Sequence, residues 1–345
     1  MDVYRLICAY FLIVETLIIP RDQLSGRHVL SGWKVSVQQN YSLNVSSITT
    51  GPDGALWFTL AGAIGRITLH GQITVFPSGM GVPGGITTGP DGNLWSTAGD
   101  QIKRTTRCGA MTTFSVPTSP SLPESIVAGP DGNLWFTELI GGRIGRITLH
   151  GHVTEFPLAI IYSTAIHPVG IVAGRDGNLW FTEQSADRIG RITVHGAITT
   201  FTLGQRLLSP TNIAMGADGN LWFTAGTEMI GRITPTGTVT AFPVPTKNSY
   251  PTGITPGPDG NMWFTEFIGK KIGRITRRGD VKEYAIPTKR LGPNGIAAGP
   301  DGNLWFTERD ANSIGRISPT GHVTMFMLAR RVMRRLVCPR RVSAP

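Results

Sequence analysis

The feature that most constrains the fold is a ten-residue motif that occurs seven times along the chain. One copy is Gly-Pro-Asp-Gly-Asn-Leu-Trp-Phe-Thr-Glu at residues 129–138, and Arg-Ile-Gly-Arg-Ile-Thr follows at residues 143–148. The tryptophan of the motif recurs every 38 to 45 residues, as Trp57, Trp95, Trp135, Trp180, Trp222, Trp263 and Trp305. A period near 40 with two strand-like runs and glycine-rich turns is typical of a β-propeller and not of a helical solenoid.

The extent of the repeat predicts one all-β domain, a seven-bladed β-propeller of four-stranded antiparallel blades. The repeat runs from about Ile48 to about Phe326 of the 345 residues. We therefore divide the chain into an apolar leader (1–30), the propeller (31–327) and a basic tail (328–345).

Each repeat is expected to supply the four strands of a blade. In the third repeat these strands are predicted at 125–128, 133–137, 143–148 and 152–156. The Asp-Gly pair between the first two strands provides the left-handed backbone of a tight hairpin. Two hypotheses for ring closure stay open, because an alternating stretch at 33–38 either completes the last blade or lies outside seven blades that are already whole.

Residue types that recur in every copy are interpreted as structural. The tryptophans should fill the interfaces between blades, where burying one contributes about 3 kcal/mol. An arginine recurs in the third strand and an aspartate in the Asp-Gly turn, and we expect the two to pair within each blade. A group needed at one catalytic point has no reason to occur seven times.

The two ends of the chain suggest little about function. The apolar run within residues 5–20 resembles the core of a secretion signal, but Glu15 interrupts it and no convincing cleavage site follows. We expect a cytoplasmic monomer, with export as the alternative.

The net charge of the chain is +10, but six of the arginines lie in the tail, so the rest of the chain carries only +4. A nucleic-acid partner is therefore not expected, and membrane contact by either end of the chain has weak support. The three cysteines, Cys8, Cys108 and Cys338, have no paired spacing and predict neither a disulfide framework nor a zinc site.

Candidate functional residues belong to the end of the propeller where the inner strands begin. There we expect a channel mouth whose side chains differ from blade to blade. The residues predicted to face a ligand are Glu124, Glu138, Glu183, Thr211, Thr252 and Asn294. Glu138, Glu183, Glu266 and Glu308 each end a second strand, and four carboxylates at one mouth could hold a divalent cation or raise one another's pKa. The alternative is that each glutamate is a partly exposed strand end.

Histidine is scarce at this predicted mouth. Among the seven histidines only His167, which precedes Pro168, is expected near it. A lone histidine in such a place is more often a loop residue than a general base. No Ser-His-Asp set, phosphate-binding loop or zinc spacing occurs in the sequence.

The repeated Gly-Pro-Asp-Gly-Asn-Leu-Trp-Phe-Thr-Glu, with Ile-Gly-Arg-Ile-Thr and Val-Thr-Glu-Phe-Pro, closely resembles the streptogramin B lyases, also called virginiamycin B lyases. The resemblance covers about 280 residues and all seven copies. It implies a seven-bladed propeller that confers antibiotic resistance by linearising a cyclic depsipeptide, through elimination across the ester with Mg2+ and a general base. It also implies two catalytic histidines at the start of the sixth and seventh inner strands, where this chain has Thr252 and Asn294. The family's acidic residue before the second of these histidines is matched by Gly292.

Three functional hypotheses follow. The first is a lyase-like enzyme of this family, with His167 and Glu308 as displaced catalytic groups and Glu266 and Glu308 near Mg2+. The second is a non-catalytic propeller that binds a peptide, glycan or protein at the mouth. The third is a nucleic-acid binder, for which the net charge is the only support.

Overall fold

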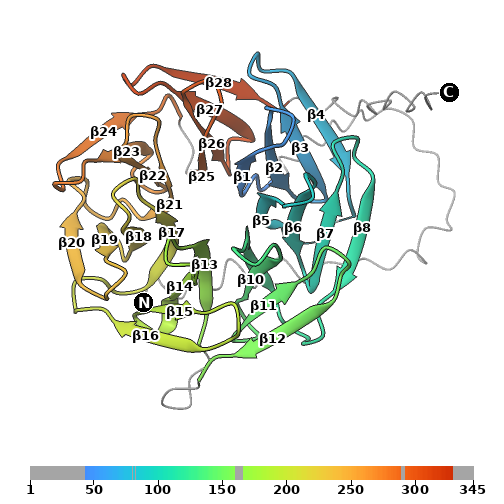
Figure 1. Cartoon of the computed structure of the whole chain (residues 1–345). Helices are drawn as coiled ribbons and strands as arrows, with labels where there is room; N and C mark the ends of the chain where they lie inside the picture. The colour runs from blue at the N-terminus through green and yellow to red at the C-terminus, as the bar shows by residue number, and fades with distance from the viewer. Residues whose placement is uncertain (1–42, 80, 82, 160–165, 289–291, 329–345) are drawn as a thin grey trace, which may run out of the picture. The chain divides into compact units, whose positions relative to one another are not determined.

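The computed structural model describes residues 43–79, 81, 83–159, 166–288 and 292–328. They form seven four-stranded antiparallel sheets, each built from four consecutive strands. The sheets surround a central axis as the blades of a propeller, from blade 1 (β1–β4) to blade 7 (β25–β28) (Figure 1). The predicted seven-bladed propeller is therefore confirmed.

The first two strands of every blade lie nearest the axis. The innermost strands are β1 (Ile48–Thr50), β5 (Pro83–Thr88), β9 (Pro123–Ala128), β13 (Pro168–Ala173), β17 (Pro210–Met215), β21 (Pro251–Pro256) and β25 (Pro293–Ala298). The second strands are β2 (Leu56–Leu60), β6 (Leu94–Ala98), β10 (Leu134–Glu138), β14 (Leu179–Glu183), β18 (Leu221–Ala225), β22 (Met262–Glu266) and β26 (Leu304–Glu308).

The last two strands complete each blade on the outside. The third strands are β3 (Ala63–Ile67), β7 (Gln101–Thr105), β11 (Arg143–Ile147), β15 (Arg188–Ile192), β19 (Met229–Ile233), β23 (Lys271–Ile275) and β27 (Ser313–Ile317). The outer strands are β4 (Ile73–Pro77), β8 (Met111–Ser115), β12 (Val153–Pro157), β16 (Ile198–Thr202), β20 (Val239–Pro243), β24 (Val281–Ala285) and β28 (Val323–Met327). A short 3-10 helix, η2 (Gln184–Ala186), joins β14 to β15. The strands predicted for the third repeat match to within two residues.

Turn chemistry explains why each repeat folds into hairpins. The glycine of every Asp-Gly pair has a positive φ, for example 76° at Gly132, which a residue with a Cβ adopts only with strain. In blade 3 this turn sets the register that pairs Trp135 with Val127 on one side and with Arg146 on the other. A one-residue slip would move the buried tryptophan to the opposite face of the blade.

The seven tryptophans are buried between blades, as the sequence predicts. Each is at most 1% exposed and stacks on an aromatic ring of its own outer strand, with ring centroids 5.2 to 5.5 Å apart. The other side packs on the next blade. Trp135 of blade 3, for instance, shares a core cluster with Leu179 and Phe181 of blade 4.

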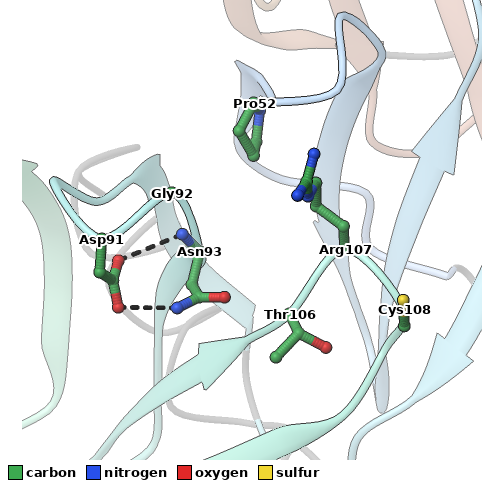
Figure 2. A pocket seen from close by; sticks show the side chains of 7 residues that line it. All are labelled: Pro52, Asp91, Gly92, Asn93, Thr106, Arg107 and Cys108. Atoms are coloured by element: carbon green, nitrogen blue, oxygen red, sulfur yellow. Dashed lines mark hydrogen bonds between the residues drawn. The ribbon is translucent and has the colours of Figure 1, made fainter. Parts of the chain in front are cut away.

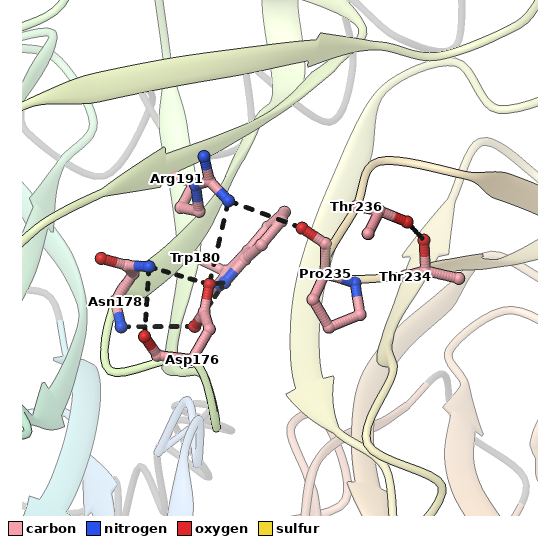
Figure 3. A network of polar contacts seen from close by, with 7 residues as sticks. All are labelled: Asp176, Asn178, Trp180, Arg191, Thr234, Pro235 and Thr236. Carbon is pink, nitrogen blue, oxygen red and sulfur yellow. Dashed lines mark hydrogen bonds and ion pairs between the residues drawn. The ribbon is translucent and has the colours of Figure 1, made fainter.

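The Asp-Gly turns carry the same polar network around one end of the ring, which we call the turn end. In blade 4, Asp176 accepts a hydrogen bond from Trp180 Nε1 at 3.2 Å and lies 4.0 Å from Arg191 (Figure 3). Arg191 also donates to the carbonyl of Pro235, which belongs to blade 5. Aspartate–arginine pairing within the blade is confirmed in blades 1, 3, 4, 6 and 7. The arginines thus fasten each blade to its own turn and, in several cases, to the next blade.

A ring of threonine hydrogen bonds fastens the blades close to the axis. The threonine before the end of each second strand accepts from a backbone N–H at the start of its own inner strand, at 2.8 to 3.1 Å. Its hydroxyl donates to a carbonyl at the start of the next inner strand, at 2.6 to 3.1 Å. The seven are Thr59, Thr97, Thr137, Thr182, Thr224, Thr265 and Thr307.

The ring closes between blades 7 and 1 with the same bond. Thr307 donates to Ser46 across 261 residues of sequence, and Asn312 accepts from the backbone N–H of Leu43. Val45 and Ile48 share a buried cluster with Trp305 and Ile314. Each described blade is therefore whole within its own repeat, and the stretch at 33–38 lies outside the described residues.

Two further expectations can be compared with the described part of the chain. Cys108 is disulfide-bonded. The spacing of the cysteines, which predicted no disulfide framework, gave no indication of this bond. Across the described ranges, no helix is both long and apolar enough to cross a membrane.

Candidate functional site

The opposite end of the ring, which we call the mouth, is where the inner strands begin and the second strands end. The register proves that these two points coincide, because Pro168 pairs with Glu183 and Pro293 with Glu308. The carbonyls bound by the threonine ring belong to seven residues here, which we call the mouth residues: Ser46, Gly84, Glu124, Val169, Thr211, Thr252 and Asn294. Their backbones are thus held alike, whereas their side chains differ in size and polarity.

Glu124 is the ionisable member of the mouth residues. Its side chain is half-buried, at the second position of β9. Burial raises its pKa to about 7, although the charge of Arg309 lowers it. Arg309 directly follows β26 in blade 7, three blades away around the ring.

Thr252 and Asn294, the positions matched to the family's histidines, lie on the neighbouring inner strands β21 and β25. The hydroxyl of Thr252 lies 2.8 Å from that of Thr265 and 3.3 Å from the carbonyl of Asn294. Thr211 makes the corresponding contact with Thr224 at 2.7 Å. The hydroxyls of Thr252 and Thr211 thus contact the ring of threonine hydrogen bonds. The side chains of Thr252, Asn294 and Thr211 cannot take up a proton near neutral pH.

His167 and Glu308, predicted as a displaced catalytic pair, lie in different parts of the ring. His167 is half-buried before β13 in blade 4, where its carbonyl accepts from Gln184 and its N–H donates to Ser185. Glu308 ends β26 in blade 7 and is 2% exposed. Blades 5 and 6 lie between them by the shorter way around the ring, and no contact joins the two.

The four glutamates that end second strands are buried between blades. Glu138, Glu183 and Glu266 have no exposed surface, so the alternative of partly exposed strand ends was wrong. Alternation along the strand places each of them on the face that packs on the preceding blade. In blade 3, for example, Glu138 shares its face with Phe136, which clusters with Trp95 of blade 2. The side chains of Glu138 and Glu183, which were predicted to face a ligand, are therefore covered by the preceding blade in this structure.

Each buried glutamate lies opposite a polar residue of the third strand. The register pairs Glu138 with Arg143, Glu183 with Arg188, Glu266 with Lys271 and Glu308 with Ser313. Arg188 Nε donates to Glu183 at 2.7 Å, and the hydroxyl of Ser313 donates to Glu308 at 2.7 Å. Blades 1, 2 and 5 instead pair Leu60 with Ala63, Ala98 with Gln101 and Ala225 with Met229.

Burial dominates the protonation of these carboxyl groups. It raises the pKa of Glu138 to about 8, assisted by the charge of Glu155 and opposed by Arg143. It likewise raises the pKa of Glu266 to about 7, assisted by Glu283 and opposed by Lys271. The pKa of Glu183 and that of Glu308 are also raised by burial, despite hydrogen bonds from Arg188 and from Ser313. The aspartates of the turn end behave oppositely, since hydrogen bonds from Asn178 and Trp180 outweigh burial and lower the pKa of Asp176.

The predicted magnesium ligands do not fit a shared metal site. Glu266 faces blade 5, because it shares a strand face with Phe264, which clusters with Trp222. Glu308 faces blade 6, because it shares a face with Phe306, which clusters with Trp263. The body of blade 6 therefore separates the two carboxylates. Within the described ranges, no group of three or more His, Cys, Asp or Glu side chains could hold a metal ion.

The turn end contains a shallow cavity of about 560 Å³ between blades 1 and 2 (Figure 2). It is lined by Pro52, by the Asp91–Asn93 turn and by Thr106–Cys108. Both carboxylate oxygens of Asp91 already accept hydrogen bonds within the protein, from Asn93 and from Trp95. We therefore interpret this cavity as the space between two structural turns.

Sequence reasoning missed Arg309, although a signal existed. The second and third strands are joined by a loop at the mouth, so the residue after each second strand lies there, and blade 7 is the blade with arginine at that point. It also missed the cross-strand partners of the glutamates, which follow them by five residues in blades 3, 4, 6 and 7.

The fold and the mouth define a class of seven-bladed propellers in which a uniform scaffold presents residues that vary from blade to blade. The profile of the virginiamycin B lyase family matches residues 27–225 and 161–337. The chain therefore belongs to the virginiamycin B lyase family. No curated protein sequence matches the chain significantly.

Solved structures agree with this assignment. Virginiamycin B lyase from Staphylococcus aureus is 39% identical and superposes with a TM-score of 0.68 over 71% of this chain and 84% of that one. A streptogramin B lyase is 33% identical, with a TM-score of 0.75 over 82% and 94% of the two chains. A catalytically inactive histidine-to-alanine variant of the S. aureus enzyme, solved with quinupristin, is 38% identical, with a TM-score of 0.68 over 72% and 85%.

Proposed function

We propose that this protein binds a cyclic depsipeptide of the streptogramin type at its mouth without linearising it through the family's histidine pair. The observation that carries the proposal is the pair of residues at the matched positions. Thr252 and Asn294 lie side by side on the neighbouring strands β21 and β25, and the hydroxyl of Thr252 is hydrogen-bonded to that of Thr265. Neither residue can act as a general base near neutral pH.

Binding and catalysis are separable in this family. A relative that has lost one histidine is described as catalytically inactive, yet its structure was solved with quinupristin. The loss of catalytic histidines here is therefore compatible with ligand binding. This proposal narrows the wider hypothesis of a propeller that binds a peptide, glycan or protein.

Elimination of the same ligand is the second candidate function, and family membership favours it. It would need a base other than the two matched residues. Because the Glu266 and Glu308 carboxylates do not fit a shared magnesium site, we assign no step to a metal.

Quinupristin is the probe for both functions. Isothermal titration calorimetry should detect binding to the folded wild-type protein, with and without magnesium. Tandem mass spectrometry should find the ring intact after prolonged incubation, because elimination leaves the mass unchanged and is recognised by the fragments of the opened chain. Ring opening would replace the first candidate by the second, and a folded protein that does not bind would contradict both.

The double variant Thr252→His and Asn294→His provides a gain-of-function test. If these two positions alone separate binding from elimination, the double variant should open the ring while the wild type does not. Thr211→His, at the same position of blade 5, is the matched control, because it adds one histidine at a mouth position that is matched to neither family histidine.

A further inference from the structure

The joint between blades 1 and 2 differs from the other six joints in its core. At each of those six, a phenylalanine of the second strand is buried against the preceding blade: Phe58, Phe136, Phe181, Phe223, Phe264 and Phe306. The ring lies over a glycine of the third strand, and a Cβ on Gly145 of blade 3 would come 2.1 Å from the ring of Phe136. Blade 2 instead has Ser96 and Lys103 at these two positions, paired across β6 and β7.

Polar groups therefore replace the aromatic ring on the face of blade 2 that packs on blade 1. Lys103 is 5% exposed, and its amine donates to the carbonyl of Ser78, just after β4 of blade 1, at 2.8 Å. Burial lowers the pKa of this amine. The hydroxyls of Ser96 and Thr105, which alternation places on the same face, are buried and have no hydrogen-bond partner among the described residues. Each costs free energy that a buried phenylalanine does not.

The turn end of this joint lacks an interaction that most joints have. Five repeat arginines donate to a carbonyl of the following blade, at 2.8 to 3.5 Å: Arg104, Arg146, Arg191, Arg232 and Arg316. Arg66 of blade 1 instead donates to Asp53 of its own blade at 2.6 Å, and within the described ranges no hydrogen bond joins it to blade 2. Arg274 of blade 6 pairs with its own turn in the same way, but its joint with blade 7 keeps the buried ring of Phe306.

The cavity of about 560 Å³ lies where the bond of Arg66 to the next blade is missing (Figure 2). The carbonyl equivalent to the acceptors of the other blades is that of Arg107, and Arg107 lines the cavity together with Pro52 of blade 1. Blades 1 and 2 are thus joined less tightly both in their shared core and at the turn end.

We propose that the joint between blades 1 and 2 is the opening joint of the ring, where neighbouring blades separate most often in the folded protein. Opening there gives water access to Ser96 and Lys103, whose polar atoms are poorly satisfied in the closed ring. Opening at another joint exposes a phenylalanine ring to water, which costs more free energy. The bond from Thr59 to the carbonyl of Gly84, at 2.8 Å, closes the joint again, so the opening is transient. The mouth widens beside Gly84 while the joint is open.

Cysteine accessibility measures this opening. Ala98 and Ala225 both end second strands and are buried against the preceding blade, Ala98 in a cluster with Trp57 and Ala225 in a cluster with Trp180. In the variants Ala98→Cys and Ala225→Cys, a maleimide can label the new thiol only when its joint separates, and the wild type gives the background of the native cysteines. The thiol of Ala98→Cys should be labelled at least about tenfold faster than that of Ala225→Cys.

A second variant tests the cause of the opening. Ser96→Phe together with Lys103→Gly gives blade 2 the residues of the other six blades. Added to Ala98→Cys, this double variant should slow the labelling to within about threefold of the rate in Ala225→Cys, because the joint regains a buried ring. Added to Ala225→Cys, it should leave the labelling rate unchanged.

Ile86→Cys and Ile126→Cys provide the same comparison if Ala98→Cys does not fold. The two isoleucines occupy the same position of β5 and β9 and are buried in the joint between blades 1 and 2 and in the joint between blades 2 and 3. The thiol of Ile86→Cys should be labelled the faster of the two, again at least about tenfold.

Three outcomes would overturn the proposal. The first is equal labelling of the two thiols within a matched pair. The second is labelling that only keeps pace with global unfolding, whose rate is measured by circular dichroism in urea and extrapolated to water. The third is a fast rate in Ala98→Cys that Ser96→Phe with Lys103→Gly does not slow.

Discussion

At the turn end of the ring all seven blades carry the same aspartate, tryptophan and arginine, whereas at the mouth seven different blades carry six different residue types in one position. The backbones at the two ends are equally regular, because the Asp-Gly turns fix one and the threonine ring fixes the other. The difference teaches which side chains the fold itself requires. A group repeated seven times maintains the scaffold, and a group that changes from blade to blade is available for recognition.

The largest expected effect comes from breaking the uniform end. Trp135→Ala and Trp222→Ala should each lower the free energy of unfolding by about 4 kcal/mol, because each leaves a cavity between two blades. Urea denaturation followed by circular dichroism measures the loss, and His322→Ala, an exposed turn residue, is the control. Costs that differ greatly between the two blades would contradict the equivalence of the turn-end positions.

A smaller effect is expected from the buried pairs at the ends of the second strands. Arg188→Met should cost about 3 kcal/mol, because it leaves Glu183 buried without its partner. The double variant Glu183→Ala and Arg188→Met copies the Ala225–Met229 pair of blade 5 and should recover at least half of that loss. If the double variant is no more stable than the single one, the pair does not act as an exchangeable structural unit.

The third prediction concerns pH. The folded pKa of Glu138, about 8, lies above its ordinary value of 4.5, so the folded state binds the proton more tightly than the unfolded state. Its contribution to stability is complete below pH 4.5 and is lost as the pH rises through 8. Thermal unfolding of the wild type should therefore occur at a lower temperature at pH 8.5 than at pH 5.5.

Glu138→Gln should reduce this difference, because glutamine resembles the protonated acid at every pH. Glu228→Gln should leave the pH dependence as it is in the wild type, since that carboxylate is only partly buried and is paired with Lys247. An unchanged slope in Glu138→Gln would show that other groups, such as Glu266, account for the loss.

Most of the scaffold could be predicted from the sequence because its determinants are local and repeated. The Asp-Gly turn and the period of the tryptophans depend on neighbouring residues, and both were identified correctly. The position of each glutamate was harder to predict. Glu183 follows four buried residues at a strand end, and only its pairing with Arg188 across the hairpin shows that it is buried with its charge compensated.

The Glu124–Arg309 pair could not be predicted from local patterns. The two residues are 185 positions apart in sequence, and the charge of Arg309 acts on the pKa of Glu124 only because the ring closes. The disulfide of Cys108 was not predicted either, since sequence spacing alone gave no sign of it. The sequence is therefore least informative about interactions between residues that are distant in the chain.

The hydrogen bond from Thr307 to Ser46, which joins the last blade to the first, has one further consequence. It has the same donors and acceptors as the six joints that lie inside the chain, so the ring has no chemically distinct seam. The position of the chain ends in the ring therefore does not change the hydrogen bonds that join the blades. A circular permutant that begins at blade 4 and links the old ends with a flexible peptide should rebuild the same seven joints, with Thr137 and Val169 as its new point of closure.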